Sequence, residues 1–299
     1  LRHTKNDITY AYVPKGPTVS IPEEKRGIFL EKLSLELQQH LPSECCCIRY
    51  DLPWLSSFEF QVKEMPRKEV REIRMNYGTE LGKLRKAPID HFTADTVLVD
   101  LSLPPAQILS RMRQTTRNSI RRSYKVNNVF TITDSITTPA QQELFQQWYD
   151  IYYETSVRKN FYSEKLPYFS RLFSKQKGSP LEDCGKGLPL YAPTPDPSFF
   201  LLTTEHEGEV LSGMILGICG RTAYYMYAGS KSTKTEQMPN YGLQWEAMRF
   251  ARMQGCRTYD LLGIPPNNNK DNPMSGLYIF KTGLGGTPVK FCGCWDFPY

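Results

Sequence analysis

The sequence predicts an α+β fold that is divided into two domains. At 299 residues the chain is longer than one typical domain, and its content of 40% hydrophobic and 12% aromatic residues is enough to form two cores. Segments with strand-like and helix-like patterns alternate along it. We expect the first domain at residues 1–102, completed by a strand at 291–299, and the second domain at residues 103–290.

The first domain is expected to alternate strands with helices. The strand that ends at Tyr50 leads directly into Asp51, Leu52 and Pro53. A carboxylate at the end of a strand is either a general base or the cap of a turn, and the residues alone leave both interpretations open. The expected strands are 8–13, 45–50 and 96–101, and the expected helices are 22–41 and 65–75.

The second domain is expected to begin with helices and to continue with three successive strands. Glu207-Gly208 and Gly220-Arg221 supply the turns between these strands. Gly255 is expected to end a later helix in the left-handed conformation. The expected helices are 104–124, one or two within 139–173, and one with Leu243, Ala247, Met248 and Ala251 inward. The expected strands are 199–205, 210–219, 222–228 and 257–262. Residues 175–198 are expected to form an irregular segment.

Two tyrosines in the third of these strands, Tyr225 and Tyr227, lie two residues apart. Successive side chains alternate between the faces of a sheet, so we expect both tyrosines on the same face. They would serve there either as half-buried packing or as a platform for a sugar or a base.

Basic residues recur every four positions on the helix expected at 104–124. No Asp or Glu occurs between residues 101 and 133. Like charges at this spacing repel one another, which favours an anionic partner. The residues leave open a solvated face, RNA phosphates or an anionic membrane surface as the explanation. We call this set the basic stripe, and it consists of Arg113, Arg117, Arg121 and Lys125.

A lysine beside a glycine-rich turn indicates either an anion site or a solvated surface lysine. Lys281 is followed by Gly283, Gly285 and Gly286. Backbone N–H groups and an ammonium can converge on a phosphate or an oxyanion at such a turn. The spacing differs from that of a P-loop, and the loop with which acetyltransferases hold coenzyme A is missing.

Composition restricts the remaining classes of function. The formal net charge of +6 permits an anionic partner without requiring one. The eight cysteines show no paired spacing of the kind that binds zinc. No apolar run approaches the ~18 residues that cross a bilayer. We therefore expect a soluble cytoplasmic protein with reduced thiols, no metal and no cofactor.

Six segments in order resemble the FemABX family of non-ribosomal peptidyltransferases. The resemblance implies two GNAT-like domains, each a twisted mixed sheet flanked by helices, in a monomer. It also implies transfer of an amino acid from aminoacyl-tRNA to a side-chain amine of a peptidoglycan precursor. The segments are YVPKGP (12–17), IRYDLP (48–53), VLVDLS (97–102), YYMYAGS (224–230), YDLLGI followed by GLYIFKTGLGG (259–286) and the terminal FCGCWDFP.

The resemblance also implies roles for individual residues. Lys281 would stabilise the oxyanion and the tRNA terminus, and Phe280 would shape the tRNA-end site. Asp51 would accept the proton, with Arg49 positioning it. The tyrosines Tyr168, Tyr225 and Tyr227 would line the site for the nucleotide-sugar peptide, and the basic stripe would contact tRNA.

The sequence departs from the family pattern at the precursor site. Glu164 stands where the family has an arginine, and Cys46 stands where it has a tyrosine. The family's opening segment, which carries a substrate-binding lysine, is not found ahead of residues 12–17; Lys15 is the candidate to replace that lysine. The acceptor is therefore either UDP-MurNAc-pentapeptide or a lipid-linked precursor, and the second would bring a peripheral contact with the inner face of the membrane.

Two other functions remain open from the sequence. One is a GNAT-like N-acyltransferase that uses acyl-CoA or another acyl donor, although the missing pyrophosphate loop counts against coenzyme A. The other is a non-catalytic protein that binds tRNA or a nucleotide and retains the fold.

Overall fold

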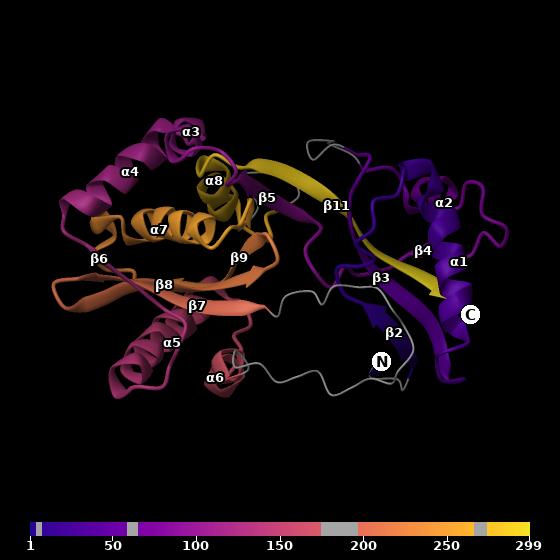
Figure 1. Cartoon of the computed structure of the whole chain (residues 1–299), viewed down its shortest axis with the longest axis horizontal. Helices are drawn as coiled ribbons and strands as arrows, with labels where there is room; N and C mark the ends of the chain where they lie inside the picture. The colour runs from indigo at the N-terminus through magenta and orange to yellow at the C-terminus, as the bar shows by residue number, and fades with distance from the viewer. Residues whose placement is uncertain (4–7, 59–64, 175–196, 266–273) are drawn as a thin grey trace. The chain divides into compact units, whose positions relative to one another are not determined.

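The computed structural model describes residues 1–3, 8–58, 65–174, 197–265 and 274–299 (Figure 1). The chain divides into two compact units. The first comprises residues 1–96, 263–278 and 288–299, and the second comprises residues 97–262 and 279–287.

The boundary between the units differs from the expected position after residue 102. It falls within β5 (Asp95–Asp100). This strand pairs antiparallel with β10 (Thr258–Asp260), and the pairing places Leu98, Val99 and Asp100 in the second unit. Sequence patterns locate a strand but do not show which sheet it joins.

The sheet of the first unit is mixed. The pairs β1–β2, β3–β11 and β4–β11 are antiparallel, whereas β2–β3 is parallel. Its strands are β1 (Arg2–His3), β2 (Thr9–Val13), β3 (Cys45–Leu55), β4 (Arg85–Lys86) and β11 (Thr287–Pro298).

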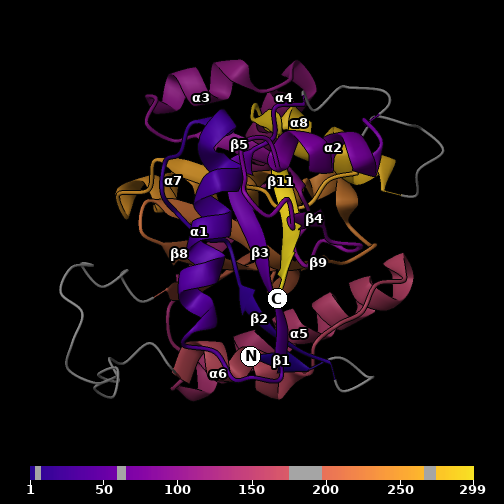
Figure 2. The same cartoon turned by 90° about the vertical axis from the view of Figure 1, so that its right-hand side faces the viewer.

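One helix covers a face of this sheet. α1 (Arg26–Gln38) follows a short 3-10 helix, η1 (Glu23–Lys25), and runs alongside β3 (Figure 2). Ser34 of α1 bonds to the hydroxyl of Tyr50 at 2.8 Å across this contact. α2 (Lys68–Met75) is the second helix of the unit. The buried core residues are Leu30, Ile48, Tyr50, Leu52, Trp54, Leu84, Trp295 and Phe297.

The sheet of the second unit is also mixed. β10 pairs parallel with β9, and the other pairs are antiparallel. The turn between β7 and β8 contains Glu207 and Gly208, both at positive φ, as a type I′ hairpin turn requires. The strands are β5, β6 (Val129–Thr133), β7 (Ser198–His206), β8 (Glu209–Cys219), β9 (Thr222–Ser230) and β10.

Helices cover both faces of the second sheet (Figure 1). α5 (Pro139–Lys159) and α6 (Leu166–Ser174) pack on one face through an aromatic core that includes Trp148 and Phe169. α7 (Pro239–Met253) packs on the other, with its predicted inward residues Leu243, Ala247, Met248 and Ala251 all buried. The remaining helices are α3 (Pro105–Arg111), α4 (Gln114–Lys125), α8 (Ser275–Gly283) and the short η2 (Thr235–Gln237).

The α+β prediction is confirmed, while the predicted bounds of a helix and of a strand are wrong. The helix expected at 104–124 is two helices, because Met112 and Arg113 adopt extended ψ angles of 153° and 148°. The strand expected to end at Tyr50 continues to Leu55, so Asp51 lies inside β3 and pairs in register with Cys294. Nearly all of the irregular segment expected at 175–198 lies outside the described residues.

Replacing Gly229 by Ala is expected to destabilise the second unit. A Cβ atom on Gly229 would lie 2.6 Å from the Cα atom of Tyr152 and 2.8 Å from the carbonyl oxygen of Ile151, so β9 and α5 would have to separate. We expect a loss of about 1–3 kcal/mol, as for other overpacked sites. Gly276→Ala is the matched control, because a Cβ atom there meets open space. Equal thermal unfolding midpoints for the two variants would contradict this packing.

Candidate active site

Lys281 is buried in the second unit. The residue is only 5% exposed, although lysine is among the residues least often found inside proteins. Its Nζ atom donates to the carbonyl oxygen of Leu262 at 3.2 Å and lies 5.6 Å from the centre of the Tyr225 ring. Burial lowers the pKa of Lys281 to about 8, and the nearby carboxylate of Asp260 opposes this change.

The place of Lys281 follows from the separation of two parallel strands. β9 and β10 pair from Thr222 and Thr258 to Tyr224 and Asp260. β10 ends there, whereas β9 continues to Ser230. Lys281 contacts Tyr225 and Leu262, which lie just beyond the last paired residues. The ammonium therefore occupies the point where the two strands part.

The glycines that follow Lys281 allow close packing. A Cβ atom on Gly285, which has φ of +83°, would lie 3.0 Å from the backbone of Arg111 and Met112. On Gly286 it would lie 2.5 Å from a methyl group of Val97. The turn is thus glycine-rich because neighbouring backbone and side chains approach it. Phe280, half-buried on the same helix as Lys281, packs its ring edge-on against Tyr241 at 5.2 Å.

The prediction that Tyr225 and Tyr227 share a face of the sheet is wrong. Ile215 of β8 pairs with Tyr227 and the next residue, Leu216, pairs with Tyr225, so Met226 is an extra residue in a β-bulge. A bulge interrupts the alternation of side chains. Tyr225 consequently contacts Lys281, whereas Tyr227 contacts the aromatic residues of α5 and α6.

Tyr227 and Tyr168 do come together, on the face covered by α5 and α6. Their hydroxyl oxygens are 3.0 Å apart. The rings of Tyr152 and Phe169 pack edge-on against Tyr227 at 6.1 and 4.9 Å. Burial, reinforced by the Tyr168 hydroxyl, raises the pKa of Tyr227 above its ordinary value. The two hydroxyl groups thus form a hydrogen-bonded pair on this face.

Asp51 is buried in the first unit beside Lys15. It is 2% exposed, and the hydroxyl of Tyr12 donates to its Oδ2 atom at 3.5 Å. Burial raises the pKa of Asp51, and the ammonium of Lys15 partly offsets this effect. A carboxylate whose pKa is raised by burial is a better proton acceptor near neutral pH than an exposed one.

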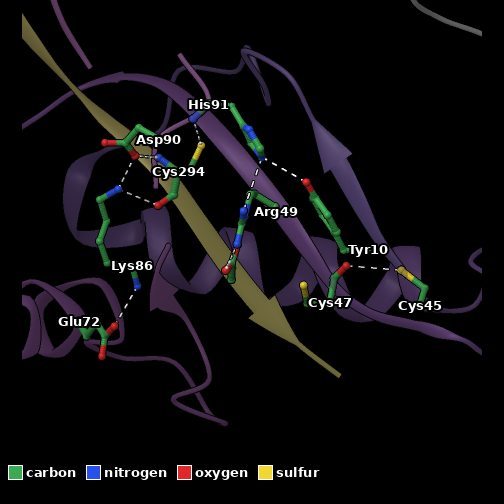
Figure 3. A network of polar contacts seen from close by, with 10 residues as sticks. Tyr10, Cys45, Cys47, Arg49, Glu72, Lys86, Asp90, His91 and Cys294 are labelled. Carbon is green, nitrogen blue, oxygen red and sulfur yellow. Dashed lines mark hydrogen bonds and ion pairs between the residues drawn. The ribbon is translucent and has the colours of Figure 1, made fainter. Parts of the chain in front are cut away.

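Arg49 is bonded to a carboxylate that the sequence analysis did not identify. Its Nε and Nη2 atoms donate to the two carboxylate oxygens of Asp296 at 2.6 and 2.7 Å. The same guanidinium reaches the ring of His91 at 3.5 Å, and His91 in turn lies 3.3 Å from the hydroxyl of Tyr10 (Figure 3). Burial, together with the charge of Arg49, lowers the pKa of His91, which favours a neutral ring.

The basic stripe begins at Arg113, the N-cap residue of α4, and its other members lie along α4. Arg113 donates to the hydroxyl of Thr282 at 2.9 Å, and Arg117 donates to the carbonyl oxygens of Ser110 and Met112. Both guanidiniums thus bind parts of their own unit. Arg121 and Lys125 are exposed on α4. These two residues are the better placed members of the stripe for a polyanion.

Two buried groups near Lys281 were missed by the sequence analysis. Asp260 ends β10, and Gln244 accepts from the hydroxyl of Tyr259 at 2.8 Å. Of the two, only Asp260 could have been singled out from the sequence, because it lies next to Tyr259 in a segment that resembles the family. A buried glutamine in a helix has no sequence signature.

Neither a metal cluster nor a membrane-crossing helix occurs in the part of the chain that the structure describes. No three His, Cys, Asp or Glu side chains gather there in a way that would hold a metal ion. None of the described helices combines the length and the apolar character needed to cross a bilayer.

The fold and the site together define an α+β protein with a buried lysine where two parallel strands part. A family model for the FemAB family matches residues 201–299, which include Tyr225, Tyr227 and Lys281. The chain is 40% identical over 97 residues to lipid II:glycine glycyltransferase of Staphylococcus haemolyticus and 38% identical over 97 residues to the enzyme of the same name from Staphylococcus aureus. These matches cover 32% of this chain, and the chain spans 23% of the length of these curated relatives.

The fold is shared with FemX over the whole chain. The crystal structure of FemX aligns with a TM-score of 0.72 and 14% identity, covering 100% of this chain and 83% of FemX. The predicted resemblance to the FemABX family is therefore confirmed by sequence over residues 201–299, and over the full length the chain shares the fold of FemX.

Replacing Lys281 by Met is expected to stabilise the protein at pH 7. The pKa of Lys281 falls from 10.5 to about 8 on folding. Between these values the unfolded chain holds a proton that the folded chain has released, so stability rises with pH, and the cost of the buried charge is fully present below the folded pKa. That cost is on the order of 3 kcal/mol.

Urea unfolding of the parent and of Lys281→Met, at pH 7 and again near pH 10.5, measures this effect. The free energy of unfolding of the variant should exceed that of the parent at pH 7, and the gap should narrow as the pH rises. A gap of the same size at both pH values would show that burial does not disfavour the ammonium.

Proposed function

We propose that this protein is a tRNA-dependent aminoacyltransferase that adds an amino acid to a side-chain amine in the stem peptide of a peptidoglycan precursor, and so forms interpeptide bridges. One observation carries the proposal: the buried ammonium of Lys281 lies within residues 201–299, the segment that matches the FemAB family, in a chain that is similar to enzymes named lipid II:glycine glycyltransferase.

The chemistry requires an oxyanion stabiliser and a proton acceptor. The free amine attacks the ester carbonyl of aminoacyl-tRNA and a C–N bond forms. The tetrahedral oxyanion then collapses, the ester C–O bond breaks, and the tRNA oxygen leaves as a hydroxyl with a proton released by the attacking nitrogen. Lys281 is suited to stabilise the oxyanion, because a charge in a site shielded from water interacts strongly with developing negative charge. Asp51, whose pKa is raised by burial, is suited to accept the proton that the ammonium nucleophile loses.

We propose a lipid-linked precursor as the acceptor, with UDP-MurNAc-pentapeptide as the alternative. Support comes from the names of the relatives and from the departures Cys46 and Glu164 at the positions where the family contacts the nucleotide precursor. Tyr168 and Tyr227 would hold the peptide through their paired hydroxyls.

A lipid-linked acceptor would bring a peripheral contact between the protein and the inner face of the membrane. Co-sedimentation with anionic vesicles tests this contact, and a chain that stays in the supernatant would oppose it.

Transfer of a labelled amino acid from charged tRNA to lipid II tests the function. The parent chain is expected to transfer label, and ribonuclease is expected to stop the reaction. Lys281→Ala should lower the rate by about 10²–10³-fold, the usual effect of removing an oxyanion donor. Lys159→Ala, at an exposed position at the end of α5, is the matched control and should behave as the parent.

Two outcomes would oppose this function. Transfer that is unaffected by ribonuclease would favour another acyl donor, and a Lys281→Ala variant with the parent's rate would exclude the proposed role of the ammonium. Comparison of lipid II with UDP-MurNAc-pentapeptide in the same assay decides between the two acceptors.

We also propose that the exposed part of the basic stripe binds tRNA. The double variant Arg121→Glu/Lys125→Glu should weaken tRNA binding and make the slope of log K against log salt less steep by about two, because each of the two cations would neutralise one phosphate. Lys159→Glu, which reverses an exposed charge on another helix, is the control. Identical salt slopes for the double variant and the parent would remove α4 from the tRNA-binding surface.

A further inference from the structure

The backbone that receives the Lys281 hydrogen bond adopts an unfavourable conformation. Leu262 has φ of +56°, a left-handed angle that costs an L-residue with a side chain roughly 1–2 kcal/mol. Leucine gains nothing locally from this angle, unlike Asn or Gly. Strained residues persist where the surrounding structure holds them, and they cluster at functional sites.

The side chain of Asp260 holds this conformation in place. Its Oδ1 atom accepts the backbone N–H of Leu262 at 2.8 Å, which closes a turn two residues long. The N–H of Leu261, between them, donates to the carbonyl oxygen of Val97 at 2.9 Å and fixes the turn to β5. Asp260 itself is 5% exposed, so water competes little for its oxygens.

The turn directs a carbonyl group at the ammonium. With Leu262 in the left-handed region, its carbonyl oxygen lies 3.2 Å from Nζ of Lys281. The carboxylate of Asp260 also acts through its charge, since it raises the pKa of Lys281 against the effect of burial. A single side chain thus affects both the direction and the charge of Lys281.

We propose that Asp260 is a positioning residue, which orients Lys281 through the Leu262 carbonyl group and supplies the negative charge that accompanies the buried ammonium. The effect of Asp260 on catalysis rests on the proposed function, whereas its effect on the orientation and charge of Lys281 does not. Asp260 need not touch the reacting atoms. It prepares the ammonium before the substrate arrives, which is how preorganised charges accelerate reactions.

Two variants separate the roles of charge and geometry. Asp260→Asn keeps an oxygen that can accept the Leu262 N–H but removes the charge, whereas Asp260→Ala removes both. Asp100→Asn is the matched control, because Asp100 caps a similar two-residue turn at Ser102, at 2.9 Å, on the exposed end of β5.

The first readout is the titration of the Lys281 side chain by NMR, with its signal assigned by its loss in Lys281→Arg. We expect the midpoint, about 8 in the parent, to fall in Asp260→Asn and to remain unchanged in Asp100→Asn. This measurement needs no substrate, so it tests Asp260 even if the proposed transfer reaction is not observed. An unchanged midpoint in a folded Asp260→Asn variant overturns the inference.

The second readout is the pH dependence of kcat in the transfer assay. The parent should lose activity as the pH rises through about 8, and in Asp260→Asn this loss should move to lower pH with little change in KM. Asp260→Ala should lose at least about tenfold more kcat than Asp260→Asn, since the carbonyl is no longer directed. In a Lys281→Arg background, where the cation does not titrate, Asp260→Asn should no longer move the pH at which activity is lost. Equal kcat for Asn and Ala at position 260 would exclude the geometric role.

Discussion

The ammonium of Lys281 is held away from water at the point where β9 and β10 part, and the rest of the second unit provides that location. The short β10 ends at Asp260, while β9 continues past Tyr224. α8 carries the lysine between them, and the glycines after it allow the chain to pass close to α3 and β5. Removal of any of these features would expose the charge or move it.

A buried cation is unfavourable for stability and useful for chemistry. Burial lowers the pKa of Lys281 to about 8, so the group remains largely charged at neutral pH. The same low-polarity surroundings strengthen its interaction with negative charge that develops nearby. The strained Leu262 fits this pattern, because it adds a second local cost at the same position. The first unit carries a buried carboxylate, Asp51, whose pKa is shifted towards neutrality for the same physical reason.

Much of the fold could be predicted from local patterns. The three- and four-residue spacing on α7 identified its buried face, and the Glu207-Gly208 turn identified the β7–β8 hairpin. Local patterns failed where a tertiary contact determined the backbone. The bulge at Met226, which sends Tyr225 and Tyr227 to opposite faces, and the break at Met112 leave no residue signature. The Arg49–Asp296 pair joins residues 247 positions apart, so no spacing could reveal it.

Lys281 was recognised because its neighbours resemble those of a family, whereas its burial could not be read from the sequence. The glycines beside it suggested an anion cradle, but the structure shows that two of them are required by the close approach of Arg111, Met112 and Val97. The role of Asp260 could not be identified from the sequence, because a carboxylate at the end of a strand resembles any turn residue until its partners are known.

A crystal structure of the chain with an amide-linked analogue of the aminoacylated tRNA end would show whether the Lys281 ammonium faces the reacting carbonyl group. We expect the acyl carbonyl oxygen to lie within hydrogen-bond distance, ~3 Å, of Nζ of Lys281, between β9 and the end of β10. An analogue bound at another place, with Lys281 still covered by protein, would contradict it.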